Sequence, residues 1–397
     1  MRASLTSLAI PLGLLATSVL SACGGGSGDD SSSDYSAYSA FGVIGQADYA
    51  SGSANRGGTA SAKSLAQPLG GVASNGTLLY IADYGNSRVL GYGSVPTSPA
   101  TDASFVLGQP DALTSLPSPA AADRLALPSK AAVGDGKLAV ADSGNNRVLI
   151  WNSLPTAGTP ADVVIGQTDF TTDDPGLSAS ALNNPTSVAL ANGKLIVVDQ
   201  GNNRVLIWNS LPTASNTAAD VVIGQSSFDT NASDDEDTGL NKPTDVWTDG
   251  YRLLIADTSN NRVLYYSQLP RSSGAAATYV IGQTDFSRTV AGISQSSLNS
   301  PTGVASDSTR IYIADASNNR VVKLDSFPIA NGAAFSAVYG QDSDTYTTRL
   351  ANDTDHDGDT DSAPSKETLS TPTGVAVVSG TLYITDRNNH RVLEFQP

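Results

Sequence analysis

Residues 141–157 read ADSGNNRVLIWNSLPTA, and residues 198–214 repeat them almost unchanged as VDQGNNRVLIWNSLPTA. Four looser copies read ADYGNSRVLGY, ADTSNNRVLYY, ADASNNRVVKL and TDRNNHRVLEF. The aspartates of the six copies are spaced by 59, 57, 58, 58 and 71 residues. A Gly-Gln pair recurs with them, and its glutamines are Gln46, Gln109, Gln167, Gln225, Gln283 and Gln341. Six copies at a nearly constant period indicate a repeat architecture.

Each unit contains four short runs rich in β-branched residues, which in the third copy are PTSVAL, KLIVVD, NRVLIW and DVVIGQ. Asn-Gly, Gly-Asn-Asn and Leu-Pro-Thr turn sequences separate these runs. A large apolar residue closes the third run of each copy, and we expect it to pack between units; these residues are Tyr92, Trp151, Trp208, Tyr266, Leu324 and Phe395. Four strands per unit without helical periodicity predict an all-β propeller blade rather than a solenoid coil.

The two ends of the chain complement each other. The last copy supplies three strands, from Thr373 to Phe395, and has no fourth. The first recognisable strand, FGVIGQ at 41–46, is a fourth strand with nothing before it. Pairing the two would remove an open sheet edge. The sequence therefore predicts a closed six-bladed β-propeller over residues 41–397, whose last blade is completed by the N-terminal strand.

The motif D-x-x-N-x-R-V, with P-x-x-V-A upstream, resembles the NHL-repeat family of six-bladed propellers over essentially all of residues 41–397. This resemblance implies the fold and not one function, because the family is diverse. The NHL-type amidating lyases use several histidines, whereas this chain has only His356 and His390, too few for a His-rich zinc site. Related gluconolactonase and paraoxonase propellers hold a central calcium with mixed Glu, Asn and Asp ligands, and no matching set is recognisable here.

The repeated aspartate and arginine are expected to be structural, since six copies cannot mark one active site. The aspartate should cap backbone N–H groups of the turn that follows the second strand, and meet an arginine of its own or the next blade. The pairs are Asp83 and Arg88, Asp142 and Arg147, Asp199 and Arg204, Asp257 and Arg262, Asp315 and Arg320, and Asp386 and Arg391.

Departures from the repeat are the places to look for chemistry. Lys130 and Asp245 stand where other copies have Ser187, Gly303 and Gly374, and Trp247 replaces an alanine. First strands line the channel of a propeller, so Lys130, Asp245 and Trp247 are candidates for a substrate-facing group, with Lys130 and Asp245 as weak catalytic candidates. The alternative is neutral drift at a position close to a loop.

The insertion at about 342–368 contains DTDHDGDTD at 353–361. Alternate carboxylates with a glycine at the turn suit a hard cation that prefers oxygen ligands. We predict a structural calcium loop whose ligands are Asp353, Asp355, Asp357, Asp359 (through its backbone carbonyl) and Asp361. Pro364 occupies the position of the last glutamate of a helix–loop–helix site, so the loop is expected to be helix-free.

The N-terminus predicts export. A basic start, an apolar run from Leu5 to Leu20 and the sequence LSAC are typical of a lipoprotein signal peptide over 1–22, with Cys23 as the lipidated residue. The alternative is a plain signal peptide with an incidental cysteine. Residues 23–40, rich in Gly, Ser and Asp, should form a flexible tether. We therefore expect a monomeric protein of the bacterial envelope, held at the outer membrane or cell surface through an N-terminal lipid.

Charge and loops limit the function classes. The formal charge is −16, which disfavours nucleic-acid binding. The connections from each Gly-Gln to the next L-x-x-P carry 20 acidic and 7 basic residues and should share one face. The leading interpretation is a non-enzymatic module that binds an envelope protein or glycan on this face. The alternatives are a lyase or lactone hydrolase using a central cation, a purely structural envelope component, and an acidic face that serves only solubility.

Overall fold

The computed structural model describes residues 38–341, 346–355 and 357–397, and their strands form six four-stranded antiparallel sheets. Blade 1 comprises β2 (Val72–Ser74), β3 (Leu79–Asp83), β4 (Arg88–Tyr92) and β5 (Phe105–Leu107). Blade 2 comprises β6 (Pro128–Gly134), β7 (Lys137–Asp142), β8 (Arg147–Trp151) and β9 (Val163–Ile165). Blade 3 comprises β10 (Pro185–Ala191), β11 (Lys194–Asp199), β12 (Arg204–Trp208) and β13 (Val221–Ile223).

The second half of the chain builds the other three blades. Blade 4 comprises β14 (Asp245–Thr248), β15 (Leu253–Asp257), β16 (Arg262–Tyr266) and β17 (Tyr279–Ile281). Blade 5 comprises β18 (Pro301–Ser306), β19 (Ile311–Asp315), β20 (Arg320–Leu324) and β21 (Ala337–Tyr339). Blade 6 comprises β22 (Pro372–Val378), β23 (Thr381–Asp386), β24 (Arg391–Phe395) and the N-terminal β1 (Gly42–Ile44).

The helical segments in the described residues are single 3₁₀ turns. They are η1 (Ala54–Gly57), η2 (Tyr84–Asn86), η3 (Ser143–Asn145), η4 (Gln200–Asn202), η5 (Thr258–Asn260), η6 (Ala316–Asn318) and η7 (Arg387–Asn389). None of these turns has the length or hydropathy to cross a bilayer. Six of the seven connect the second strand of a blade to its third.

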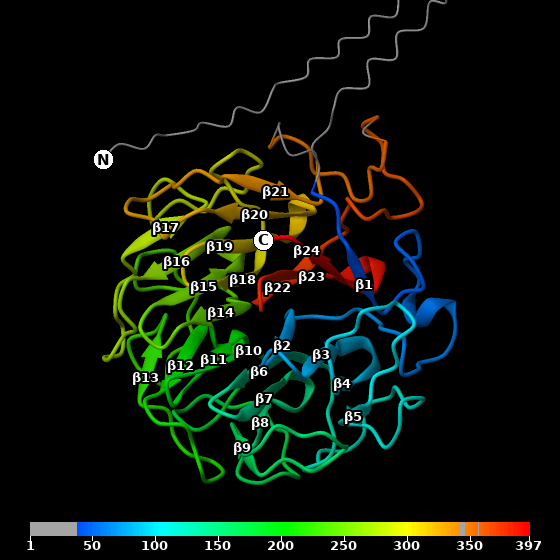
Figure 1. The fold of residues 1–397 in the computed structure, drawn as a ribbon. Helices are drawn as coiled ribbons and strands as arrows, with labels where there is room; N and C mark the ends of the chain where they lie inside the picture. The colour runs from blue at the N-terminus through cyan, green and yellow to red at the C-terminus, as the bar shows by residue number, and fades with distance from the viewer. Residues whose placement is uncertain (1–37, 342–345, 356) are drawn as a thin grey trace, which may run out of the picture. The chain divides into compact units, whose positions relative to one another are not determined.

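The first strand of every blade lies nearest the central axis (Figure 1). Each of these six strands contacts the first strand of the next blade, and β22 contacts β2, so the ring is closed. The predicted six-bladed propeller is confirmed.

Closure is made by pairing the two ends of the chain, as predicted. β1 lies antiparallel to β24, with Gly42 opposite Glu394 and Ile44 opposite Val392 (Figure 1). Gln46 Nε2 donates to the backbone oxygens of Asn389 (3.2 Å) and His390 (3.1 Å). Gln109 makes the corresponding bond to Ser87 within blade 1. The repeat is therefore continuous across the gap between the termini.

The residue that follows each 3₁₀ turn between the second and third strands, η2 to η7, forms a hydrogen bond to the chain that enters the next blade. It adopts a left-handed conformation, with φ between 51° and 53°, which favours Asn over β-branched residues. Asn203 Oδ1 accepts a hydrogen bond from the Lys242 N–H at 2.8 Å, and His390 Nδ1 accepts one from the Gln67 N–H at 2.8 Å. Burial lowers the pKa of His390, which keeps Nδ1 available as an acceptor. His390 thus replaces an asparagine in a structural role.

The core fills the spaces between neighbouring blades. Trp208 of blade 3 packs in one cluster with Ile150 and Ile165 of blade 2. The large residues that close the third strands are all at most 3 % exposed: Tyr92, Trp151, Trp208, Tyr266, Leu324 and Phe395. Burying a side chain of this size contributes about 2–3 kcal/mol. Their predicted packing between blades is confirmed.

Candidate functional site

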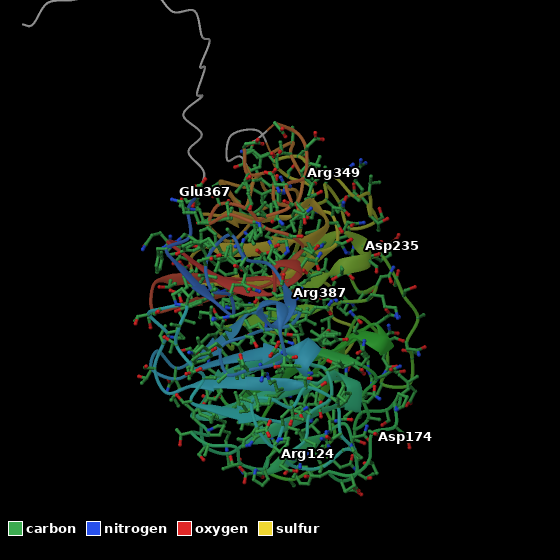
Figure 2. The ribbon with its side chains drawn as sticks, turned by 90° about the vertical axis from the view of Figure 1, so that its right-hand side faces the viewer. Arg124, Asp174, Asp235, Arg349, Glu367 and Arg387 are labelled. Carbon is green, nitrogen blue, oxygen red and sulfur yellow. The ribbon has the colours of Figure 1, made fainter. Side chains whose placement is uncertain are left out.

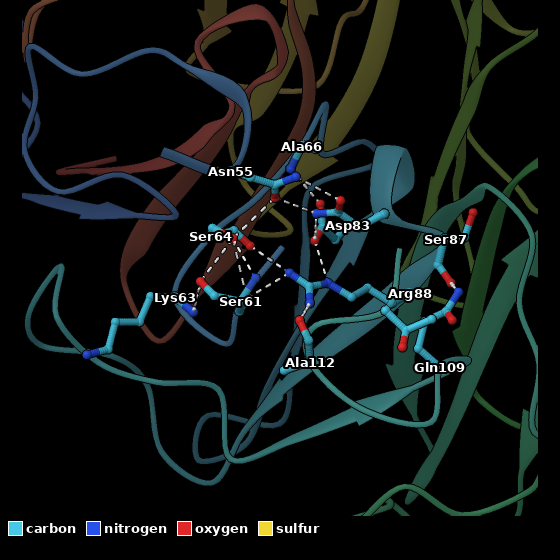
Figure 3. A network of polar contacts seen from close by, with 12 residues as sticks. Asn55, Ser61, Lys63, Ser64, Ala66, Asp83, Ser87, Arg88, Gln109 and Ala112 are labelled. Atoms are coloured by element: carbon cyan, nitrogen blue, oxygen red, sulfur yellow. Dashed lines mark hydrogen bonds and ion pairs between the residues drawn. The ribbon is translucent and has the colours of Figure 1, made fainter. Parts of the chain in front are cut away.

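The repeated Asp–Asn–Arg unit is a buried junction of hydrogen bonds (Figure 3). In blade 1, Asp83 Oδ2 accepts bonds from Asn86 Nδ2 and Arg88 Nε, both at 2.7 Å. Asp83 Oδ1 accepts the Ala66 N–H at 2.7 Å. Arg88 also donates to the backbone oxygen of Ala112 in the connection that leaves the blade. The unit therefore joins the chain entering a blade to the chain leaving it.

The same contacts recur in all six blades, so the unit is structural, and each arginine belongs to the same blade as its aspartate. One expectation is wrong. The aspartate does not cap N–H groups of the turn after it, because its Oδ1 is taken by an N–H from the segment that leads into the first strand. Burial raises the pKa of Asp257 to about 6, although the Arg262 guanidinium opposes this shift.

A ring of hydroxyl groups surrounds the axis where the first strands begin. Thr186 Oγ1 donates to the backbone oxygen of Thr244, and Thr244 Oγ1 donates to that of Thr302, both at 3.0 Å. Ser129, Thr302 and Thr373 make corresponding bonds to the next blade. Blade 1 has Leu69 at this position and makes no such bond. The near-equivalent groups of this ring link the blades and are not a catalytic set.

Lys130 and Asp245 meet inside the channel as an ion pair between Lys130 Nζ and Asp245 Oδ1. Asp245 Oδ1 also accepts a bond from Ser187 Oγ at 2.6 Å, and Oδ2 accepts the Val304 N–H at 2.9 Å. Both carboxylate oxygens are therefore engaged by the protein. The pair neutralises itself and bridges blades 2 and 4.

Trp247 does not join this pair. Its ring packs against Phe327, with centroids 5.8 Å apart, and the Arg252 guanidinium lies 5.8 Å from the Trp247 centroid. Trp247 lines a cavity of about 210 Å³ that is bordered mainly by Ala and Val residues and by Lys130, and Asp245 does not border it. The three candidates taken from the sequence thus do not form one group.

The opposite end of the channel holds a cavity of about 270 Å³ bordered mainly by residues with polar side chains, which we call the mouth cavity. It is lined by the hydroxyl ring, Asp245, Leu69, Gly70 and Asn184, and by four residues of the 3₁₀ turns: Tyr84, Ser143, Gln200 and Arg387. Each of these four directly follows the repeated aspartate, where the copies carry unlike residues. That variability was visible in the sequence, but nothing in one copy showed that the position faces the axis.

The aspartate loop brings three predicted ligands together. One carboxylate oxygen each from Asp353, Asp355 and Asp361 lies within 4.8 Å of the others. Asp353 is only 7 % exposed, and its Oδ1 is buried without a hydrogen-bond partner. Asp357 and Asp359 are not part of this group; Asp357 Oδ1 instead accepts the Asp359 N–H at 2.9 Å. Gly358 has φ +95°, as the tight turn requires.

The charged connections divide unequally between the two ends of the blades. In an antiparallel blade, the connection leaving the fourth strand and the turn after the second strand lie at the same end. The connections leaving fourth strands carry the 20 acidic and 7 basic residues, whereas the connections at the opposite end carry 7 and 3. Asp174 and Asp235 lie toward the right-hand side of Figure 2, whereas Glu367, near the end of the last of these connections, lies toward the left. Asp229, Asp234, Asp235 and Glu236 are all exposed.

The predicted signal peptide, Cys23 and most of the tether lie outside the described residues, as do Asp342, Asp344 and His356. The described part of the chain begins with contacts to the propeller. Tyr38 packs on Tyr339 with ring centroids 4.4 Å apart, and the Ala40 N–H donates to the backbone oxygen of Lys366 at 2.8 Å.

Comparison with known proteins agrees with this fold. The family model for the NHL repeat matches residues 369–395, which include the first three strands of blade 6. No curated protein sequence matches the chain. A structural genomics protein of unknown function from Bacteroides thetaiotaomicron VPI-5482 is similar in structure, with a TM-score of 0.53 and 13 % identity over 89 % of this chain and 75 % of that one.

More distant structures include two lyases. A streptogramin B lyase has a TM-score of 0.45 and 10 % identity over 84 % of this chain and 94 % of that one. A virginiamycin B lyase from Staphylococcus aureus has a TM-score of 0.42 and 9 % identity over 83 % of this chain and 95 % of that one. Likenesses this low say nothing about activity. The chain is a six-bladed β-propeller that carries an NHL repeat in its last blade.

Proposed function

We propose that this chain is a lipid-anchored, extracytoplasmic propeller that binds a protein or glycan on its acidic face, and that a basic protein is the preferred partner. The acidic face comprises the connections that leave the fourth strands. The excess of exposed carboxylates on this one face is the observation that carries the proposal. Such a surface attracts a basic partner and speeds its association. The export and anchoring follow from the lipobox-like LSAC sequence and Cys23.

The geometry gives no support to a lyase or lactone hydrolase that uses a central cation. Such a cation needs free carboxylate oxygens at the channel. Asp245 is the carboxylate that lines the mouth cavity in the described part of the chain, and both of its oxygens already accept protein hydrogen bonds. Arg387 also lines the mouth cavity, and its positive charge would repel a metal ion.

Site-specific photo-crosslinking in native envelopes tests the binding face. A crosslinker at Asp235, on the acidic face, should give a discrete adduct that weakens as salt is raised. The same crosslinker at Thr213, exposed in the β12–β13 connection at the opposite end, should give none. Neutralising Asp235 and Glu236 (Asp235→Asn, Glu236→Gln) should reduce adduct formation by a nearby probe at Asp229, whereas neutralising Asp220 and Asp325, exposed at the opposite end, should not. Equal labelling from both faces would rule out the acidic face as the binding surface.

We further propose that calcium orders the aspartate loop and braces this face. The buried Asp353 Oδ1 lacks a donor, and a cation would satisfy it while neutralising Asp355 and Asp361 beside it. Three carboxylates supply at most six oxygens, so backbone carbonyls or water would complete the shell that calcium prefers. Calcium here would supply charge neutralisation and local order, with no catalytic step.

Isothermal titration of the full chain should show one calcium site with a dissociation constant on the order of 0.1–1 mM. At tenfold excess over that constant, calcium should stabilise the fold by only about 1.4 kcal/mol, because linkage grows with the logarithm of concentration. Asp353→Asn should weaken binding at least tenfold, since it removes the buried charge. Asp229→Asn, an acidic residue in another connection, serves as the control. No calcium binding down to millimolar affinity would refute the site.

A further inference from the structure

The position directly after the repeated aspartate is the variable element of an otherwise constant turn. The aspartate, asparagine and arginine of each turn are engaged in the same bonds in every blade. The residue after the aspartate is Tyr84, Ser143, Gln200, Thr258, Ala316 and Arg387 in blades 1 to 6. The turn therefore forms with aromatic, small, polar or charged side chains at the position after the aspartate. Four of these six side chains line the mouth cavity, so they are available to contact a ligand there.

Arg387 is the residue at this position that blade structure does not explain. It forms no ion pair with an acidic side chain of the described residues, and its terminal nitrogens donate no hydrogen bond there; its Nε also lacks a partner but is covered by protein atoms. Figure 2 shows Arg387 near the right-hand end of the blade 6 strands. The terminal nitrogens are therefore the donors that a ligand or ordered water in the cavity would satisfy, because the covered Nε cannot be reached from it. The Lys130–Asp245 pair cancels its own charge, so Arg387 makes the mouth cavity positive.

Other groups around the mouth cavity complement the guanidinium. Blade 3 lies opposite blade 6 in a six-membered ring, so Gln200 faces Arg387 across the axis. The Gln200 Oε1 accepts a bond from Asn184 Nδ2 at 2.9 Å, which leaves its amide N–H groups directed elsewhere. The O–H groups of Thr186 and Thr302 donate to backbone carbonyls, and their oxygens keep lone pairs that can accept a bond from a ligand O–H. The cavity thus offers donors for an anion and acceptors for hydroxyl groups.

We propose that the mouth cavity binds a small hydroxylated monocarboxylate of the sugar-acid class, with its carboxylate on Arg387. A planar guanidinium matches a carboxylate through two parallel N–H···O bonds. The single positive charge of Arg387 balances the single negative charge of a carboxylate, whereas a phosphate dianion would keep one negative charge without a counter-charge. A volume of about 270 Å³ is below that of most drug-sized sites and suits a single sugar ring.

The acidic face does not prevent a carboxylate from entering. The acidic run 229–237 begins six residues after β13, the outermost strand of blade 3. Its backbone oxygens accept bonds from Asn260 and Arg262, and its acidic side chains Asp234, Asp235 and Glu236 are exposed. Charges on the solvent-exposed surface are screened over about 8 Å at physiological salt. The ligand should therefore bind more tightly at physiological salt than in dilute buffer, because screening removes the repulsion of the face before it weakens a contact inside the cavity.

Titration of the full chain with glucuronate, followed by calorimetry, tests this site. Saturable binding is expected. Arg387→Gln should weaken the affinity about tenfold to a hundredfold, because it removes hydrogen bonds to the charged carboxylate. This variant places in blade 6 the residue that blade 3 already carries, so the turn should still fold. Arg349→Gln, an exposed arginine on the same face, should leave the affinity unchanged.

Two further titrations define the ligand class. Glucose should bind at least tenfold more weakly than glucuronate, because it lacks the charge that pairs with Arg387. Gln200→Glu should also abolish most glucuronate binding by placing a carboxylate opposite the ligand. The proposal is wrong if glucuronate shows no saturable binding at millimolar concentrations, if Arg387→Gln binds it normally, or if inorganic phosphate displaces it at equal concentration. Crosslinking on the acidic face is independent of all three outcomes.

Discussion

Replacing Arg204 by methionine should lower the free energy of unfolding by about 3–5 kcal/mol. Arg204 is fully buried, and its Nε donates to Asp199 Oδ2 at 2.7 Å. Methionine occupies similar space but leaves the Asp199 carboxylate buried without its counter-ion. The backbone oxygens of Phe228, Ser178 and Ala181 also lose their donor. The cost is large because desolvated charge and carbonyls are left unpaired together.

Calorimetry measures this effect as a fall in Tm of roughly 4–8 °C for a propeller of this size. Arg204→Lys should recover only part of the loss, because an ammonium group cannot reach three carbonyls and a carboxylate as a planar fork does. Arg349→Met, at an exposed arginine, should leave Tm within a degree or so of the parent. Equal Tm values for Arg204→Met and Arg349→Met would show that the repeated unit does not stabilise the fold.

Removing residues 1–46 should open the ring and destabilise the propeller by on the order of 5 kcal/mol. The deletion removes β1, whose Val43 and Ile44 are each 3 % exposed, and burying such side chains contributes about 1.5–3 kcal/mol apiece. It also removes the bonds of Gln46 to the turn of blade 6. β24 then becomes an unprotected edge that invites pairing with another molecule.

Removing residues 1–37 is the matched control, because it leaves β1 in place. This shorter deletion should preserve Tm and a monomeric elution volume. The longer deletion should lower Tm by roughly 5–10 °C and produce concentration-dependent association in size-exclusion chromatography. If both truncated chains unfold at the same temperature, β1 does not hold the ring closed.

The two deletions should also differ in how the stability of the fold depends on pH. Glu394 of β24 is 8 % exposed, and its carboxyl lies over Gly42 of β1. Burial raises the pKa of Glu394 from 4.5 to about 7. Between these values the folded chain holds a proton that the unfolded chain has lost, so this group makes stability fall as pH rises. Without β1 the carboxyl regains water, and the fall between pH 4.5 and 7 should diminish.

The sequence was sufficient for the architecture because a blade is a local unit. Hairpin strands of five or six residues, such as those ending at Asp199 and beginning at Arg204, pair with neighbours close along the chain. Six copies of one pattern then leave a single arrangement in which every blade has four strands. The closing strand was also predictable. The last repeat has three strands and lacks a fourth, and the N-terminal strand is a fourth strand without a blade of its own, so the two complete one blade.

The candidate site was only partly predictable. Lys130 and Asp245 were recognised as departures from the repeat, but their distance in sequence, 115 residues, gave no sign that each would neutralise the other. Arg387, Gln200 and Tyr84 were overlooked because they stand beside an aspartate whose structural role dominates the motif. What they share is that they line the mouth cavity, and this becomes apparent only when the six turns are arranged around the axis.

Periodicity, turn residues and the split last repeat are properties of neighbouring residues, so the sequence by itself determined the six blades, their strand order and the closure of the ring. The clustering of carboxylates in the loop DTDHDGDTD was also predictable, because their spacing along the chain is local. Ring closure alone decided which side chains share the mouth cavity and which charges cancel. These contacts join residues from different blades, and their energies depend on burial and distance across the axis, which no single repeat encodes.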